Sequence, residues 1–179
     1  MGTTGEKVLI GCGIALGIFV ALIIALILAI GAAIETGYIP ETTALPAGKI
    51  HPRYIKQLKE IGVINPDEKV LYFYSGSLIS VKNEGNLYTK DRLISYKKYN
   101  DELEMYSAPY HEITAIEFEP SKSWMEESTI TVTLIDGSWF EFAVSADSNG
   151  DKKFYDKLIE TWKRNKEDII VKDKPGQSH

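Results

Sequence analysis

Cysteine is nearly absent from this chain of 179 residues, and histidine is rare. The single cysteine, Cys12, lies in an apolar run, which excludes a disulfide scaffold. His51, His111 and His179 stand far apart, and none has the spacing to cysteine or carboxylate that a metal site needs. Glycine-rich phosphate loops are missing, and Ser75-Gly76-Ser77 lacks the context of a hydrolase nucleophile, so we interpret it as a loop. The sequence therefore predicts no enzyme, no metal site and no cofactor.

Charge is missing from one long stretch. The 27 residues from Val8 to Ile34 contain no charged side chain and no proline, and 23 of them are hydrophobic. As a helix this run would be about 40 Å long, against a bilayer hydrocarbon core of about 30 Å. A single transmembrane helix is therefore predicted over residues 8–34, behind a short leader of residues 1–7. The run holds no ionisable residue, which excludes an ion or proton path through it.

Two processing signals are alternatives to a permanent helix. A secretory signal peptide has an apolar core of roughly 7–15 residues, about half the length found here. Residues 9–12 resemble a bacterial lipoprotein box, but 22 further apolar residues follow Cys12. A complete helix leaves an acyl chain little to add to anchoring. We therefore expect an uncleaved helix in which Cys12 is an ordinary apolar residue.

Small residues recur along the apolar run. Gly13 and Gly17 form a pair that allows two membrane helices to approach closely. Helix packing at these two glycines, and a homo-oligomer formed through this helix, are therefore predicted. Glycine and alanine are also common in membrane helices generally, so a helix that does not associate stays an alternative.

The basic residues that flank the apolar run bear on its orientation. The N-terminal side offers Lys7 and the α-amino group, and the C-terminal side offers Lys49 and Arg53 within about 20 residues, with Lys56 and Lys59 just beyond. Because basic flanks tend to stay in the cytoplasm, this count favours a cytoplasmic C-terminal domain. The opposite orientation needs a shift of only one or two charges and stays open.

The remainder of the chain has the composition of a soluble domain. Residues 35–51 contain two prolines and little periodicity and are predicted as a linker, and residues 52–64 form a short amphipathic helix. From residue 67 the hydrophobic period changes from 3.6 to 2, which is typical of short antiparallel strands. Strands are expected at residues 70–74, 86–89, 92–98, 103–106, 113–118, 129–134 and 139–144. Helical spacing returns over residues 151–166, and residues 167–179 form a charged tail.

This order of elements is that of the pleckstrin-homology-like (PH-like) superfold. The stretch from Gly85 to Tyr96 resembles a hairpin of bacterial PH-like and GRAM-like domains. Two shorter stretches, Asp67 to Val70 and Tyr110 to Ile113, resemble strand entries in the same families. The resemblance covers residues 65–166 and implies an α+β, mainly-β barrel of about seven antiparallel strands with a capping C-terminal helix. It also implies a binding module, because these families carry no catalytic motif.

Several basic residues lie in the early hairpins, but the domain as a whole has no excess of positive charge. Residues 50–166 hold 16 basic and 19 acidic side chains, which argues against a nucleic-acid partner or a strongly anionic lipid surface. The resemblance nevertheless makes five cations candidate lipid or partner contacts, because eukaryotic PH domains gather cations in their early hairpins for phosphoinositide headgroups. These are Lys82, Lys90, Arg92, Lys97 and Lys98. Arg92 could instead pair with a neighbouring carboxylate.

Two further surfaces are candidates for binding. The loop over residues 120–127 carries Trp124 and Met125, which could insert into a partner or the bilayer surface, or fold over the rim of the barrel. The helix over residues 53–61 would become a docking helix if it did not pack on the barrel.

The sequence as a whole predicts a single-pass membrane protein that presents a PH-like interaction module to the cytoplasm. Its predicted partners are the bilayer, contacted by residues 8–34, and a protein that the module recruits or assembles at the membrane. A lipid-sensing or small-ligand-sensing domain is one alternative, and an accessory subunit of a larger membrane enzyme is another.

Overall fold

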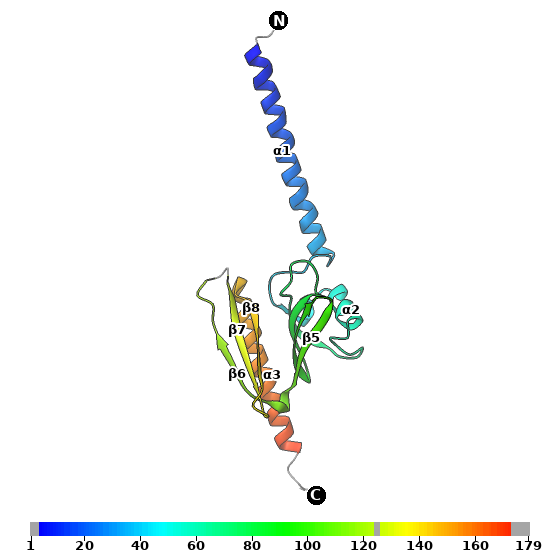
Figure 1. Cartoon of the computed structure of the whole chain (residues 1–179), viewed down its shortest axis with the longest axis vertical. Helices are drawn as coiled ribbons and strands as arrows, with labels where there is room; N and C mark the ends of the chain where they lie inside the picture. Colours follow the sequence, from blue (N-terminus) through cyan, green and yellow to red (C-terminus); the bar gives the residue numbers. More distant parts are fainter. Residues whose placement is uncertain (1–3, 124–125, 173–179) are drawn as a thin grey trace. The chain divides into compact units, whose positions relative to one another are not determined.

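The chain divides into two units, Met1–Ile39 and Pro40–His179. The computed structural model describes residues 4–123 and 126–172, with side chains for residues 16–123 and 126–166 (Figure 1). In the first unit, helix α1 spans Thr4–Glu35. Gly37 ends it with a φ of 68°, and the Tyr38 N–H donates to the Ala33 carbonyl at 2.8 Å. This left-handed cap suits glycine and satisfies the last carbonyls of the helix.

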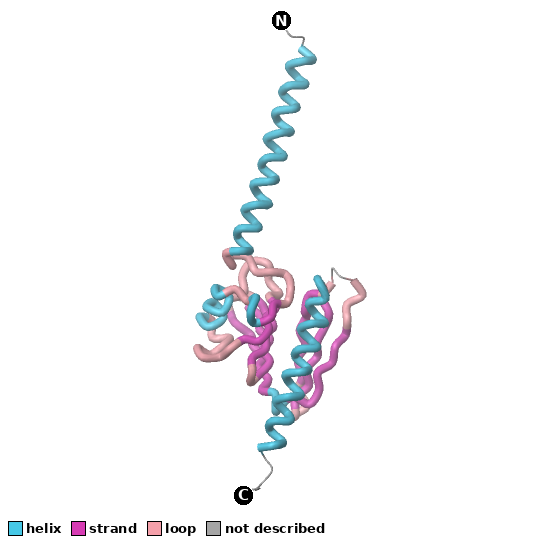
Figure 2. The backbone as a smooth tube through the Cα atoms, turned by 180° about the vertical axis from the view of Figure 1, so that it is seen from behind, coloured by secondary structure: helices cyan, strands magenta, loops and turns pink. Residues whose placement is uncertain are grey.

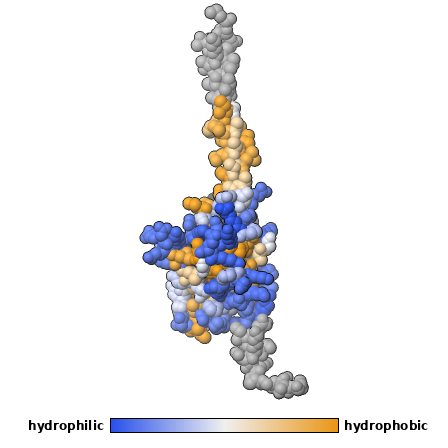
Figure 3. Space-filling model, turned by 90° about the vertical axis from the view of Figure 1, so that its right-hand side faces the viewer, coloured by the Kyte–Doolittle hydropathy of each residue, from blue (hydrophilic) through white to orange (hydrophobic). Residues whose placement is uncertain are grey.

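Helix α1 is apolar on its surface rather than amphipathic. Among the described residues, Leu16–Glu35 is the one stretch long and apolar enough to cross a membrane by length and composition, and none of it is buried. Large side chains such as Leu22 and Leu28 are more than 60% exposed. Figure 3 shows hydrophobic colours along the face of this stretch that is in view.

The second unit contains two antiparallel sheets. Sheet A has the order β1-β2-β3-β4-β5, and sheet B has the order β6-β7-β8. Sheet A comprises β1 (Leu45–Pro46), β2 (Val70–Tyr74), β3 (Glu84–Thr89), β4 (Arg92–Tyr99) and β5 (Glu102–Pro109). Sheet B comprises β6 (Ile113–Glu119), β7 (Glu127–Leu134) and β8 (Trp139–Ser145). Three short 3₁₀ turns, η1 (Ala47–Lys49), η2 (Tyr110–Glu112) and η3 (Asp147–Asn149), complete the connections.

The two faces of sheet A bury two different cores. One core lies between sheet A, sheet B and the C-terminal helix and includes Tyr88, Leu93 and Ile130. The other covers the opposite face of sheet A and includes Leu58, Phe73 and Ile94. Sheet A is therefore the central layer of the domain (Figure 2).

Helix α2, Pro52–Glu60, covers the second core. Pro52 occupies the first turn, and the Nδ1 atom of His51 accepts a hydrogen bond from the Arg53 N–H at 3.1 Å, which caps the helix. Tyr54 and Leu58 are almost fully buried. The apolar face of this helix is thus used within the domain and does not form a free docking helix.

Helix α3, Gly150–Lys172, follows β8 and runs along sheet B (Figures 1 and 2). Phe154 and Leu158 are fully buried in the first core. The predicted fold class is confirmed: an apolar N-terminal helix, antiparallel strands and a C-terminal helix. The structure has eight strands because two residues of the predicted linker, Leu45 and Pro46, pair with β2 as β1.

Candidate functional site

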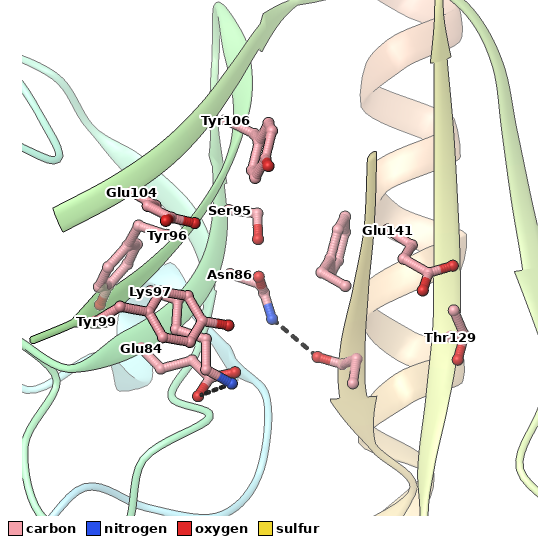
Figure 4. Close-up of a pocket in the computed structure, with 12 residues that line it drawn as sticks. Glu84, Asn86, Ser95, Tyr96, Lys97, Tyr99, Glu104, Tyr106, Thr129 and Glu141 are labelled. Atoms are coloured by element: carbon pink, nitrogen blue, oxygen red, sulfur yellow. Dashed lines mark hydrogen bonds and ion pairs between the residues drawn. The ribbon is translucent and has the colours of Figure 1, made fainter. Parts of the chain in front are cut away.

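A cleft opens between the two sheets of the domain (Figure 4). Its volume is about 340 Å³, at the lower end of the range for small-molecule sites. Strands β3, β4 and β5 form one wall, and β7 and β8 form the other.

Strand register builds the wall that sheet A contributes. Side chains on one face of a sheet form rows across neighbouring strands. Two polar rows line the cleft, and the next row is buried. The rows are Glu84–Lys97–Glu104, then Asn86–Ser95–Tyr106, then the buried Tyr88–Leu93–Ala108. Polarity therefore rises along the wall from the core towards the mouth of the cleft.

Side chains tie the two sheets together beside the cleft. Asn86, 4% exposed, donates from Nδ2 to the Ala143 carbonyl at 2.8 Å, as Figure 4 shows. The Tyr74 hydroxyl, held protonated because burial raises its pKa, donates to the carboxylate of Glu127. These bonds cross between sheets that share no strand pairing with one another.

The cleft carries an excess of negative charge. Lys97 pairs with Glu84 at 2.9 Å, and this hydrogen bond raises the pKa of Lys97. Glu104 and Glu141 also line the cleft, and neither has an ion pair among the described residues. Tyr99 and Tyr106 add aromatic surface to the wall of sheet A that carries Glu104, whereas the Glu141 side chain points away from this wall (Figure 4). Carboxylates next to aromatic rings favour a cationic group.

Both strands that flank the cleft are edge strands. Among the described strands, β5 pairs only with β4, and β8 pairs only with β7. Met105, Tyr106 and Trp139, on these two strands, are 41%, 53% and 62% exposed. An exposed edge strand offers unpaired backbone groups to an extended peptide.

The five cations predicted as contacts do not form one cluster. Lys90 and Arg92 lie where β4 begins, and Lys97 and Lys98 lie about 17 Å away, near its end. Lys82 pairs with Glu60 at 2.8 Å, and Lys98 pairs with Asp101 at the same distance. Within the described part of the chain, exposed Lys90 has no ion pair. Their role as lipid or partner contacts stays a prediction.

Arg92 forms the most buried of these ion pairs. Its Nε and Nη2 atoms donate to the two carboxylate oxygens of Glu68 at 2.8 and 2.6 Å, and Nη1 donates to Ser107 at 2.9 Å. The side chains of Arg92 and Glu68 are 20% and 6% exposed. The bonds from Arg92 lower the pKa of Glu68. Arg92 thus joins the approach to β2 with β4 and β5.

The remaining predicted contact residues lie only partly within the described part of the chain. Trp124 and Met125 lie outside the described residues, as does everything about Gly13 except its place in α1. At Gly17, nothing lies within 4 Å of the position that a Cβ atom would take. That surface is open to a neighbouring helix.

Sequence reasoning missed the cleft. Its signal is weak: on the inward face of β3 and β4, the polar Asn86 and Ser95 lie between an apolar row and a charged row. No group of three or more His, Cys, Asp or Glu side chains suited to a metal occurs among the described residues. The arrangement suits binding of a cationic segment.

Two solved structures are similar to this chain at low identity. One is a DUF1696 family protein with a pleckstrin-homology domain from Shewanella loihica, with 16% identity, a TM-score of 0.45, and coverage of 69% of this chain and 97% of that one. The other is a pleckstrin homology domain from Shewanella amazonensis, with 15% identity, a TM-score of 0.43, and coverage of 62% and 96%. No family model and no curated protein matches the sequence.

Proposed function

We propose that this chain is a single-pass membrane protein whose PH-like domain holds a protein partner at the membrane. The observation that carries the proposal is the exposed apolar surface of Leu16–Glu35. As a helix this stretch is about 30 Å long, which matches the hydrocarbon core of a bilayer. Leaving such a surface in water costs about 25 cal/mol for each Å² of apolar area, so a bilayer is its favoured surrounding.

The domain is placed in the cytoplasm in this proposal. Lys49 and Arg53 follow the apolar helix, whereas Lys7 and the α-amino group precede it. With Lys56 and Lys59 just beyond them, the C-terminal side carries more basic residues, which supports this orientation. Small residues at Gly13 and Gly17 support association of two such helices in the bilayer.

The partner proposed for the cleft is an extended protein segment with a lysine or arginine. Glu104 has no ion pair among the described residues and attracts the cation beside the rings of Tyr99 and Tyr106, and Glu141, on the outer side of β8, adds negative charge at the rim. The edge of β5, and the part of the β8 edge beyond the Ala143 carbonyl that Asn86 occupies, supply backbone hydrogen bonds to an added strand. Binding of this kind needs no reactive group, in keeping with a role in recruitment.

Charge reversal in the cleft tests this role. Purification of the full chain in mild detergent is expected to recover a partner, and Glu104→Lys with Glu141→Lys is expected to reduce its recovery about tenfold or more, because lysine would repel the cationic segment. Quantitative mass spectrometry of the recovered proteins measures the effect.

The matched control reverses two carboxylates elsewhere. Glu117→Lys with Glu119→Lys makes the same change in net charge on exposed positions of β6, away from the cleft. This variant is expected to keep the partner. Equal losses in both double variants would mean that net charge alone governs recovery and would refute the cleft as the partner site.

A further inference from the structure

A second cavity lies between η1 and α3. Its volume is about 590 Å³, well within the range for small-molecule sites. Pro46 and Gly48 form one wall, Leu71 and Tyr72 form an apolar side, and one face of α3 forms the other wall. The residues that α3 contributes recur at helical spacing from Lys153 to Arg164.

One residue that lines the cavity has a buried hydroxyl that the fold leaves unsatisfied. Tyr88 lines it and is 1% exposed, and its hydroxyl has no hydrogen-bond partner among the residues that the structure describes. Burial, with the nearby Tyr110, Tyr72 and Glu160, raises the pKa of Tyr88, so the hydroxyl stays a proton donor. The neighbouring Tyr110 differs, because its hydroxyl donates to the Thr89 carbonyl at 2.9 Å. A buried donor without an acceptor costs stability, so an acceptor brought by a ligand would be favoured.

Two of the cations around the cavity, Lys153 and Arg164, have no ion pair among the described residues. Lys157 pairs with Glu160 at 2.6 Å, and Lys153 donates to the Ser148 carbonyl at 2.8 Å. Asp156 pairs with Lys152, which lies outside the cavity lining. Arg164 lines the cavity and has no ion pair or hydrogen bond among the described residues. A planar guanidinium of this kind pairs well with a carboxylate.

We propose that this cavity binds a small amphipathic carboxylate, with its apolar body against Leu71 and Tyr72 and its carboxylate on Arg164 and the Tyr88 hydroxyl. Arg164 neutralises the charge, and Tyr88 gains the acceptor that it lacks. The ligand would also contact Pro46 and Gly48, in the segment that follows α1 in the sequence. The proposal concerns the domain alone and stands apart from the proposed partner in the cleft.

The unsatisfied hydroxyl predicts an unusual pair of stability effects. Tyr88→Phe removes a donor that bonds nothing, so the melting temperature of the ligand-free chain is expected to rise by about 3 °C. Tyr110→Phe removes a formed hydrogen bond and is expected to lower it by a similar amount. Tryptophan fluorescence during heating measures both. A lower melting temperature for Tyr88→Phe would mean that the hydroxyl is satisfied after all and would remove the basis for the site.

The binding experiment uses the full chain in nanodiscs of neutral lipid and octanoate as the soluble probe. Calorimetric titration is expected to show octanoate binding at least tenfold more tightly than uncharged octanamide, after subtraction of empty nanodiscs. Arg164→Gln and Tyr88→Phe are each expected to weaken octanoate binding about tenfold. Lys163→Gln removes an exposed cation of the same helix that does not line the cavity, and is expected to change binding less than about twofold.

A second arm identifies the source of the carboxylate. Nanodiscs containing oleate, without octanoate, are expected to raise the melting temperature of the wild-type chain but not of Arg164→Gln if a fatty acid of the bilayer can reach the cavity. Binding of octanoate with no effect of oleate supports a soluble ligand instead. No response in either arm, or a response that Arg164→Gln and Tyr88→Phe leave unchanged, overturns the proposal.

Discussion

Replacing Leu22 and Leu26 together by arginine is expected to remove the chain from the membrane fraction. Both side chains are more than 60% exposed and lie one helical turn apart in α1. Each arginine near the centre of a membrane helix opposes insertion by about 2.5 to 3.5 kcal/mol, so the pair opposes it by about 5 to 7 kcal/mol. Cell fractionation with an alkaline wash, followed by blotting, measures the retained protein.

The control for this experiment keeps the helix and its apolar character. Leu22→Ala with Leu26→Ala shortens the same two side chains without charge and is expected to stay in the alkali-resistant fraction. Retention of the double arginine variant in that fraction would show that α1 does not cross the bilayer. It would leave the carboxylate site unaffected, since that site lies in the domain alone.

Replacing Arg92 by alanine is expected to lower the free energy of unfolding by about 3 kcal/mol. The change leaves the Glu68 carboxylate, 6% exposed, without the two hydrogen bonds that now offset its burial. Removing one partner of a buried ion pair costs about 3 to 5 kcal/mol, and the partial exposure of Arg92 places this pair at the lower end. Guanidinium titration of the full chain in nanodiscs, followed by tryptophan fluorescence, measures the loss.

Two further variants distinguish the loss of the buried ion pair from the loss of a surface charge. Arg92→Lys keeps the charge but cannot form the bidentate hydrogen bonds to Glu68. It is therefore expected to lose roughly half as much stability as Arg92→Ala. Lys90→Ala removes an exposed cation two residues away that has no ion pair among the described residues, and is expected to change stability by less than about 0.5 kcal/mol. If Arg92→Ala were as stable as the wild type, the pair with Glu68 would not hold the fold, and a role for Arg92 in ligand contact would gain weight.

The same pair predicts an acid dependence of stability. The pKa of Glu68 is lower in the folded chain, chiefly because Arg92 donates hydrogen bonds to it. Its contribution is therefore fully present above the unfolded value of about 4.3 and is lost as the pH falls through the folded pKa. The stability difference between wild type and Arg92→Ala is expected to be largest near neutral pH and to shrink below about pH 4. A difference that stays constant down to pH 3 would contradict the assignment.

The parts of the fold that local pattern determines could be predicted from the sequence. The alternation along β7 and β8 and the turn at Asp136-Gly137 are recovered, and Gly137 has the positive φ, 84°, that such a turn favours. Helix α2 starts at Pro52, as expected from its first-turn preference, and Gly62 follows its end with a φ of 74°. In each case the signal lies within a few residues of the structure that it specifies.

The parts that depend on distant contacts could not be predicted. Leu45 and Pro46 sit among prolines and glycines without periodicity, and they form β1 only because the edge of β2 is available to them. The cleft depends on the angle between two sheets and on a bond between Asn86 and Ala143, 57 positions apart. Glu68 lies 24 positions before Arg92, so the sequence suggested that this arginine pairs with a carboxylate but could not identify the partner.

The shortness of β1 has a mechanical consequence. The strand has two residues, and one of them, Pro46, has no N–H to donate, so few backbone bonds hold this edge of sheet A. A pull on the chain from its N-terminal side would meet only these few backbone bonds when it reached β1. Leu45 and Ala44, both buried, would then supply most of the resistance. β1 would therefore detach first, which would lengthen the linker after α1 while β2 to β8 remained folded.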